Sequence, residues 1–158
     1  MLLLLLSFFP AFLVAVWSFY SHTTSNLSNY GNLLHPPLQQ INFSKDGSWR
    51  LCMLVDKNCD SLCSHQLFLL RQMRLGMGQK SLNLDRVVFS VKPIVWPHDS
   101  DLYKGVQNIN LRSSEFDNFH VSRGIYLVDP SGFVVMSWPS HPDPRLLMED
   151  LDKIMKFY

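Results

Sequence analysis

The sequence predicts an α/β fold, a domain with a central mixed sheet and flanking helices behind one N-terminal transmembrane helix. Three observations lead to this prediction. Residues 2–20 form an uncharged, mostly apolar run that is long enough to cross a bilayer. Two short apolar runs, residues 49–55 and 85–91, enclose an amphipathic segment. Turn residues at 129–132 join two further apolar runs, after which a second amphipathic segment ends the chain.

The N-terminal run is expected to be an uncleaved anchor at residues 1–20. Trp17 and Tyr20 stand where an interfacial aromatic belt would lie. A cleaved signal peptide is the alternative, but no basic residue precedes the run and no clear A-x-A site follows it. Residues 21–32 are rich in Ser, Thr and Asn, as in a flexible tether. Residues 33–158 are then expected to form the folded domain.

The distribution of charge predicts which side of the membrane the domain occupies. No Lys or Arg occurs from Ser21 to Ser44, and positive charge is what keeps a short flank in the cytoplasm. We therefore expect a single-pass protein of a bacterial inner membrane, with a cytoplasmic N-terminus and a periplasmic domain. The whole chain has 14 Lys and Arg against 13 Asp and Glu, so it offers no basic surface for nucleic acid.

The domain is expected to begin with extended backbone. The double proline in residues 33–37 favours an extended chain, and residues 41–43 are expected to form a short edge strand. Residues 49–55 are apolar and bounded by turn residues on both sides, which is typical of a buried central strand.

A helix is expected directly after this strand. Asn58 is a suitable N-cap, which would make Cys59 the first helical residue. Gly76 and Gly78 are expected to end the helix. Residues 85–91, rich in β-branched side chains, are expected to form the next strand. Together the three elements make a βαβ unit.

After this unit the local signals of secondary structure are weak up to residue 119 and clear again from residue 124. Residues 93–119 are interrupted by prolines and a glycine, and only a helix within 113–119 is expected there. Residues 129–132 (Asp-Pro-Ser-Gly) suit a type I turn. Residues 124–128 and 133–136 are therefore expected to pair as an antiparallel hairpin.

The chain is expected to end in a helix opened by Asp143 and Pro144, with leucines on its buried face. Acidic residues, including Glu149 and Asp150 early in this helix, are expected on the surface. The resulting order β-α-β-(α)-β-β-α, with a cysteine pair at the first strand-to-helix junction, is the thioredoxin-like arrangement.

Cys59 and Cys63 are the main candidates for function, because two thiols four residues apart share one face of a helix. The unpaired N–H groups of a helix N-terminus favour a thiolate. On a regular helix the two Cβ atoms would lie about 5–6 Å apart, whereas a disulfide needs about 3.5–4.5 Å. A disulfide therefore requires Cys59 to be displaced from the helix. The wider spacing suits two sulfurs that share a soft cation such as Cu(I).

Two further side chains complete the set of candidates. Cys52 lies inside the predicted central strand and is expected to be a buried, unreactive thiol. Copper would need a third ligand, and His120, just before the hairpin strand, is the candidate. The alternatives are a purely structural role for the cysteines of the pair and a surface position for His120.

Three motifs resemble the SCO/SenC family: Leu54–Val55, Cys59-x-x-x-Cys63, and the run Ile125–Gly132. The similarity covers roughly residues 45–157 and includes the single N-terminal anchor. The segment Tyr30–Pro37 adds a similarity to a proteobacterial subgroup of small SCO-like transmembrane proteins linked to cytochrome c oxidase assembly.

Three positions depart from the family pattern. Asp60 stands where the family commonly has proline, and Ser64 replaces another frequent proline. His120 lies six residues before Tyr126, whereas the family's copper histidine typically lies five before that tyrosine.

The resemblance implies a thioredoxin-fold protein that helps to assemble cytochrome c oxidase by delivering copper or by reducing its cysteines. It implies that Cys59 and Cys63 are a redox pair and, with His120, a copper(I) site. The implied partners are the membrane and the copper-binding oxidase subunit or its assembly factors. Two alternatives stay open: a periplasmic thiol-disulfide oxidoreductase that does not use copper, and a docking module without chemistry. Whether the protein is an enzyme depends on this choice.

Overall fold

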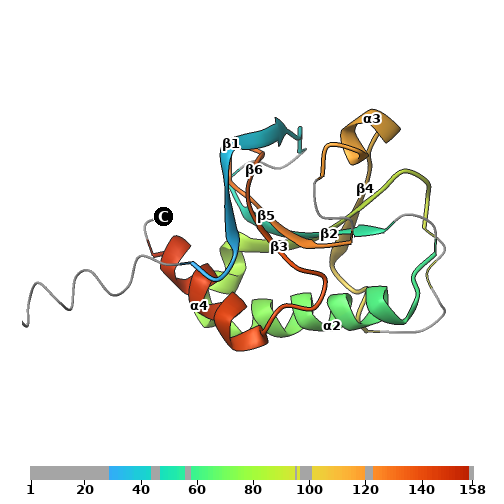
Figure 1. Ribbon diagram of the computed structural model, residues 1–158. Helices are drawn as coiled ribbons and strands as arrows, with labels where there is room; N and C mark the ends of the chain where they lie inside the picture. Colours follow the sequence, from blue (N-terminus) through green and yellow to red (C-terminus); the bar gives the residue numbers. More distant parts are fainter. Residues whose placement is uncertain are drawn as a thin grey trace, which may run out of the picture.

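A computed structural model describes residues 29–43, 47–55, 58–94, 96, 101–119 and 123–156. In these residues six strands form one sheet in the order β1-β6-β5-β2-β3-β4 (Figure 1). The strands are β1 (Asn32–Gln40), β2 (Trp49–Val55), β3 (Leu84–Ser90), β4 (Val106–Asn110), β5 (Ile125–Val128) and β6 (Phe133–Trp138). The helices are α2 (Ser61–Gly76), the 3₁₀ helix η1 (Gly78–Asn83), α3 (Ser113–Phe116) and α4 (Pro144–Ile154).

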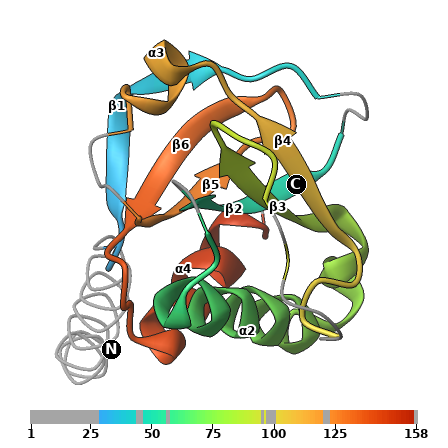
Figure 2. The same ribbon diagram turned by 90° about the vertical axis from the view of Figure 1, so that its right-hand side faces the viewer.

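The sheet is covered on both faces. Helices α2 and α4 lie beside each other against one face, and α3 lies on the opposite side (Figures 1 and 2). Side chains alternate along a strand, so Leu51 and Met53 belong to the core on the helix side, while Cys52 and Leu54 belong to the core on the other side. Every residue of β2 is buried. This explains why its sequence, apart from the buried Arg50, is apolar throughout instead of alternating.

The pairing of the strands confirms the predicted thioredoxin-like fold with a mixed sheet. Strands β2 and β3 are parallel and are connected through α2, as the predicted βαβ unit requires. Strand β5 runs antiparallel to both β2 and β6. Because β2 ends at Val55 and α2 begins at Ser61, the cysteine pair lies at the carboxyl end of the central strand.

Two edge strands differ from the prediction. The N-terminal edge strand is β1, and residues 41–43 are not in a strand. The pairing of β1 with β6 is irregular between Leu33 and Leu38, the stretch that contains both prolines, and edge strands are where prolines are tolerated. The hydrophobic pattern does not predict β4, because most of its residues are polar and none is buried.

A buried carboxylate attaches the start of the domain to its last helix. Asp150 of α4 is 1% exposed, and it accepts hydrogen bonds from the backbone N–H of Tyr30 (3.2 Å) and of Gly31 (2.7 Å). The indole N–H of Trp138 donates to it as well, at 3.1 Å. The surface position predicted for Asp150 is therefore wrong. Tyr30 and Gly31 therefore contact the domain, although the sequence places both residues in the tether.

None of the helices in the described residues is both long and apolar enough to cross a membrane. The anchor expected at residues 1–20 lies outside the described residues, as does the part of the tether before residue 29.

Replacing Asp150 with Ala is expected to lower the free energy of unfolding by about 2–4 kcal/mol, because buried donors left without a partner each cost about 1–3 kcal/mol. Urea unfolding of residues 29–158, followed by tryptophan fluorescence, measures the change. The matched control is Glu149→Ala, since Glu149 is the exposed neighbour on the same helix. Its expected effect is within about 0.5 kcal/mol. Equal losses in the two variants would contradict a role for the buried carboxylate.

Candidate functional site: the Cys59–Cys63 pair

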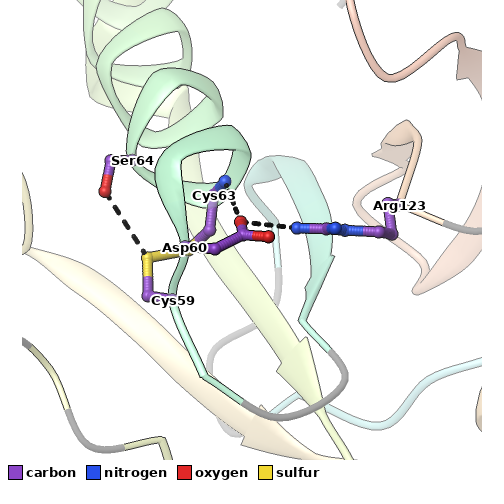
Figure 3. Close-up of a disulfide and its surroundings, with 5 residues drawn as sticks. All are labelled: Cys59, Asp60, Cys63, Ser64 and Arg123. Atoms are coloured by element: carbon purple, nitrogen blue, oxygen red, sulfur yellow. Dashed lines mark hydrogen bonds and ion pairs between the residues drawn. A yellow bond between two sulfur atoms is a disulfide. The ribbon is translucent and has the colours of Figure 1, made fainter.

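Cys59 and Cys63 form a disulfide, with their Cα atoms 5.1 Å apart (Figure 3). Helix α2 begins at Ser61 and has Asp60 as its N-cap. Cys59 therefore precedes the helix and Cys63 lies in its first turn. This is the displacement of Cys59 from the helix that a disulfide between residues four apart requires. The predicted N-cap at Asn58 and the predicted helical position of Cys59 are wrong by two residues. Asp60 is the cap because its carboxylate accepts the backbone N–H of Cys63 at 3.0 Å.

The two cysteines differ in exposure. Cys63 is 1% exposed and belongs to the core between the sheet and its helices. Cys59 is partly exposed and packs against the edge of that core. The hydroxyl oxygen of Ser64 lies 4.0 Å from the sulfur of Cys59. Thiol–disulfide exchange needs access to the sulfur, so Cys59 is the sulfur that a partner can reach.

Asp60 connects the cysteine pair to the loop before β5. Its carboxylate lies 2.6 Å from the guanidinium of Arg123 (Figure 3). The hydrogen bond from Arg123, followed by the one from the backbone N–H of Cys63, holds the pKa of Asp60 below its usual value. A full negative charge therefore stands next to the disulfide at neutral pH, with a cation directly against it.

Arg123 has a left-handed backbone conformation, with φ of 63°, which is uncommon for a residue with a side chain. Such a conformation persists where the surrounding structure holds it. Here Gln66 of α2 and the N-cap Asp60 bind the backbone and the side chain of Arg123, respectively. The side-chain amide of Gln66 donates to the Arg123 carbonyl at 2.6 Å, and Asp60 binds the guanidinium. Gln66 is 1% exposed and also donates to the carbonyl of Ser140, at 2.9 Å.

The histidines do not complete a metal site within the described residues. His120, the candidate third ligand, lies outside them. In the part of the chain that the structure describes, no group of three or more His, Cys, Asp or Glu side chains could hold a metal ion. His65 and His141 are both exposed, and their rings stack with centroids 6.0 Å apart. The pair of sulfurs alone thus fits a soft cation here, as two thiolate ligands.

Cys52 is a buried free thiol, as predicted. It is 0% exposed and lies on the face of the sheet away from α2. Burial raises the pKa of this thiol well above its usual value, and the nearby charge of Arg50 offsets the rise only in part. Because the thiolate is the reactive form of cysteine, Cys52 is unsuited to thiol exchange.

The sequence does not reveal Asp60 and Arg123 as members of the site. Asp60 carries an N-cap signal, but Asn58 carries the same signal two residues earlier. The contact between Asp60 and Arg123 joins residues 63 positions apart, and no local pattern predicts it.

Comparison with known proteins places the domain in a family. A family model described as a transmembrane-like, thioredoxin-like, C-terminal domain matches residues 49–157. No curated protein sequence matches this chain.

Solved structures of Sco proteins have a similar fold. Yeast Sco1 is similar with a TM-score of 0.54 and 17% identity, over 71% of this chain and 82% of that chain. Copper-bound ScoI of Arabidopsis thaliana is similar with a TM-score of 0.53 and 14% identity, over 72% of this chain and 87% of that chain. At the level of the fold, these structures confirm the resemblance found in the sequence motifs. With the family match over residues 49–157, we conclude that this chain belongs to the transmembrane-like, thioredoxin-like C-terminal domain family.

Proposed function

We propose that this chain is a Sco-like assembly factor for cytochrome c oxidase in which Cys59 and Cys63 act as a dithiol–disulfide couple. The observation that carries the proposal is the geometry of the pair: the two sulfurs are bonded, Cys59 is partly exposed and Cys63 is buried. The motif resemblance to the SCO/SenC family supports the oxidase as the client, and the fold shared with yeast Sco1 is in agreement with that resemblance.

The proposal includes the topology expected from the sequence. Residues 1–20 anchor the chain in a bacterial inner membrane, and the tether runs from residue 21 up to the contacts of Tyr30 and Gly31. The remainder of the chain forms the domain in the periplasm. The description of the family as transmembrane-like supports this arrangement. Disulfides persist in oxidising compartments such as the periplasm, and the bond between Cys59 and Cys63 is in keeping with that location.

As a reductant, the pair passes two electrons to a client disulfide. The Cys59 thiolate attacks one client sulfur, which forms a mixed disulfide and releases the other client sulfur as a thiolate. The Cys63 thiolate then attacks the sulfur of Cys59. This step re-forms the Cys59–Cys63 bond and releases the second client thiolate. The client thiolates take up protons from water, and a separate thiol reductant returns the oxidised pair to the dithiol.

Delivery of copper(I) is a second candidate function, favoured by the same two sulfurs. Thiolates are soft ligands that suit Cu(I), and the structure of Arabidopsis thaliana ScoI, which has a similar fold, contains copper. Cu(I) would be cargo held by reduced Cys59 and Cys63, with His120 as the proposed third ligand. The disulfide form lacks thiolates, so the redox state of the pair would decide whether copper binds.

The redox function predicts different effects for the two cysteines. The reduced chain is incubated with a disulfide-bonded peptide that copies the copper-binding segment of the oxidase subunit, and products are identified by non-reducing electrophoresis and mass spectrometry. Cys63→Ser is expected to accumulate a mixed disulfide through Cys59, because nothing resolves it. Cys59→Ser is expected to form no adduct and to reduce no peptide. Cys52→Ser is the control and is expected to act as the wild type; reduction by Cys59→Ser at the wild-type rate would contradict the mechanism.

The copper function predicts one Cu(I) per reduced chain, measured by competition with a chromophoric chelator. Binding is expected to be lost in Cys59→Ser and in Cys63→Ser. His120→Ala is expected to weaken binding about tenfold or more, a difference of about 1.4 kcal/mol. Unchanged binding in His120→Ala would remove the histidine from the site, and unchanged binding in Cys59→Ser would refute copper delivery by the pair. Failure of both the redox and the copper assays would favour the docking module.

A further inference from the structure

We infer that Asp60 and Arg123 are positioning residues that set the reduction potential of the Cys59–Cys63 pair. Asp60 makes the reduced pair a stronger reductant, and Arg123 moderates this effect. The inference deepens the proposed thiol–disulfide function and rests on it.

Two contacts fix the position of the Asp60 carboxylate at the start of α2. It follows Cys59 directly in the chain and accepts the backbone N–H of Cys63 at 3.0 Å. On its other side it meets the guanidinium of Arg123 at 2.6 Å (Figure 3). Neither contact uses a sulfur atom, so the charge of Asp60 acts on the pair through space.

The sign of this effect follows from the charges of the two redox states. The disulfide is neutral, whereas the reduced pair reacts as a thiolate. A neighbouring carboxylate repels the thiolate and leaves the neutral disulfide nearly unaffected, so it raises the free energy of the reduced state. A less stable reduced state transfers its electrons more readily, which lowers the reduction potential. The cation of Arg123 opposes the carboxylate and moves the potential back upward.

The position of Asp60 as the helix cap also lowers the reduction potential. N–H groups at a helix N-terminus stabilise anions, and here the N–H of Cys63 donates to the carboxylate of Asp60. The carboxylate thus accepts an N–H group at the N-terminal end of the helix, and this N–H is no longer free to stabilise the thiolate of Cys59. An uncharged cap such as Asn would keep the hydrogen bond and remove the negative charge.

A purely structural role does not account for the ion pair. The side chains of Arg123 and Asp60 are 42% and 50% exposed, and an ion pair this exposed adds little to stability. Yet Arg123 has a strained backbone, and α2 holds it there through Gln66 and Asp60. Strained residues that are fixed in this way cluster at functional sites.

The test compares reduction potentials of full-length chains in detergent micelles at pH 8. Each chain is equilibrated with reduced and oxidised glutathione, the thiols are trapped by alkylation, and the oxidised fraction of the Cys59–Cys63 pair is determined by mass spectrometry. Asp60→Asn keeps the cap and removes the charge, so its potential is expected to rise. Arg123→Gln leaves the carboxylate unopposed, so its potential is expected to fall. Each change is expected to alter the equilibrium constant about threefold to tenfold, or about 14–30 mV.

The matched controls are Asp152→Asn and Lys80→Gln. Asp152 is 45% exposed and also pairs with a cation, Lys80. Lys80 belongs to η1, which follows the C-terminal end of α2, whereas the cysteine pair lies at its N-terminal end. Both controls are expected to keep the wild-type potential. A second measurement, the rate of Cys59 alkylation by iodoacetamide, is expected to rise in Asp60→Asn and to fall in Arg123→Gln.

The results separate this inference from the function on which it rests. The inference would be overturned if Asp60→Asn and Arg123→Gln shifted the reduction potential in the same direction, or by no more than the controls. The proposed function would still stand in that case, provided that the wild-type pair is reduced and oxidised reversibly. A wild-type pair that does not change between dithiol and disulfide in the glutathione buffer would contradict both the inference and the proposed function.

Discussion

The hydrogen bond from the backbone N–H of Cys63 to the carboxylate of Asp60 is the interaction on which the rest of the site depends. It makes Asp60 the N-cap of α2 and leaves Cys59 outside the helix. On a regular helix the Cβ atoms of the two cysteines would be about 5–6 Å apart, too far to bond. The same carboxylate carries the charge that Arg123 balances. One side chain thus determines both the geometry and the local electrostatics of the pair.

The sheet gives this arrangement a rigid support. Strand β2 is buried along its whole length and ends just before the cysteines, and Cys63 extends the same core into the first turn of α2. Gln66, one turn further, ties α2 to the loops at Arg123 and Ser140. Cys59, which is partly exposed, therefore lies at the edge of a well-packed layer, where another molecule can approach it while Cys63 stays protected.

Elements with strong local signals could be predicted from the sequence, and contacts between distant residues could not. Strand β2 was predicted to the residue from its apolar run, and the cap of α4 from Asp143 and Pro144. Strand β4 lacks the apolar pattern that a prediction needs. The choice between Asn58 and Asp60 as the cap depends on how the chain leaves β2, which local propensity does not encode. The pairing of Asp60 with Arg123 and the burial of Asp150 arise only when the sheet has assembled.

We propose that Cys59 and Cys63 form a working redox couple and not a structural crosslink. The most direct measurement is the reduction potential of this pair in the full-length chain, with all three cysteines followed separately by mass spectrometry. We expect a single two-electron transition above about −300 mV, in which Cys59 and Cys63 change together while Cys52 stays a thiol. A reduction potential of the pair below about −300 mV, which is typical of structural disulfides, would contradict the proposed redox couple.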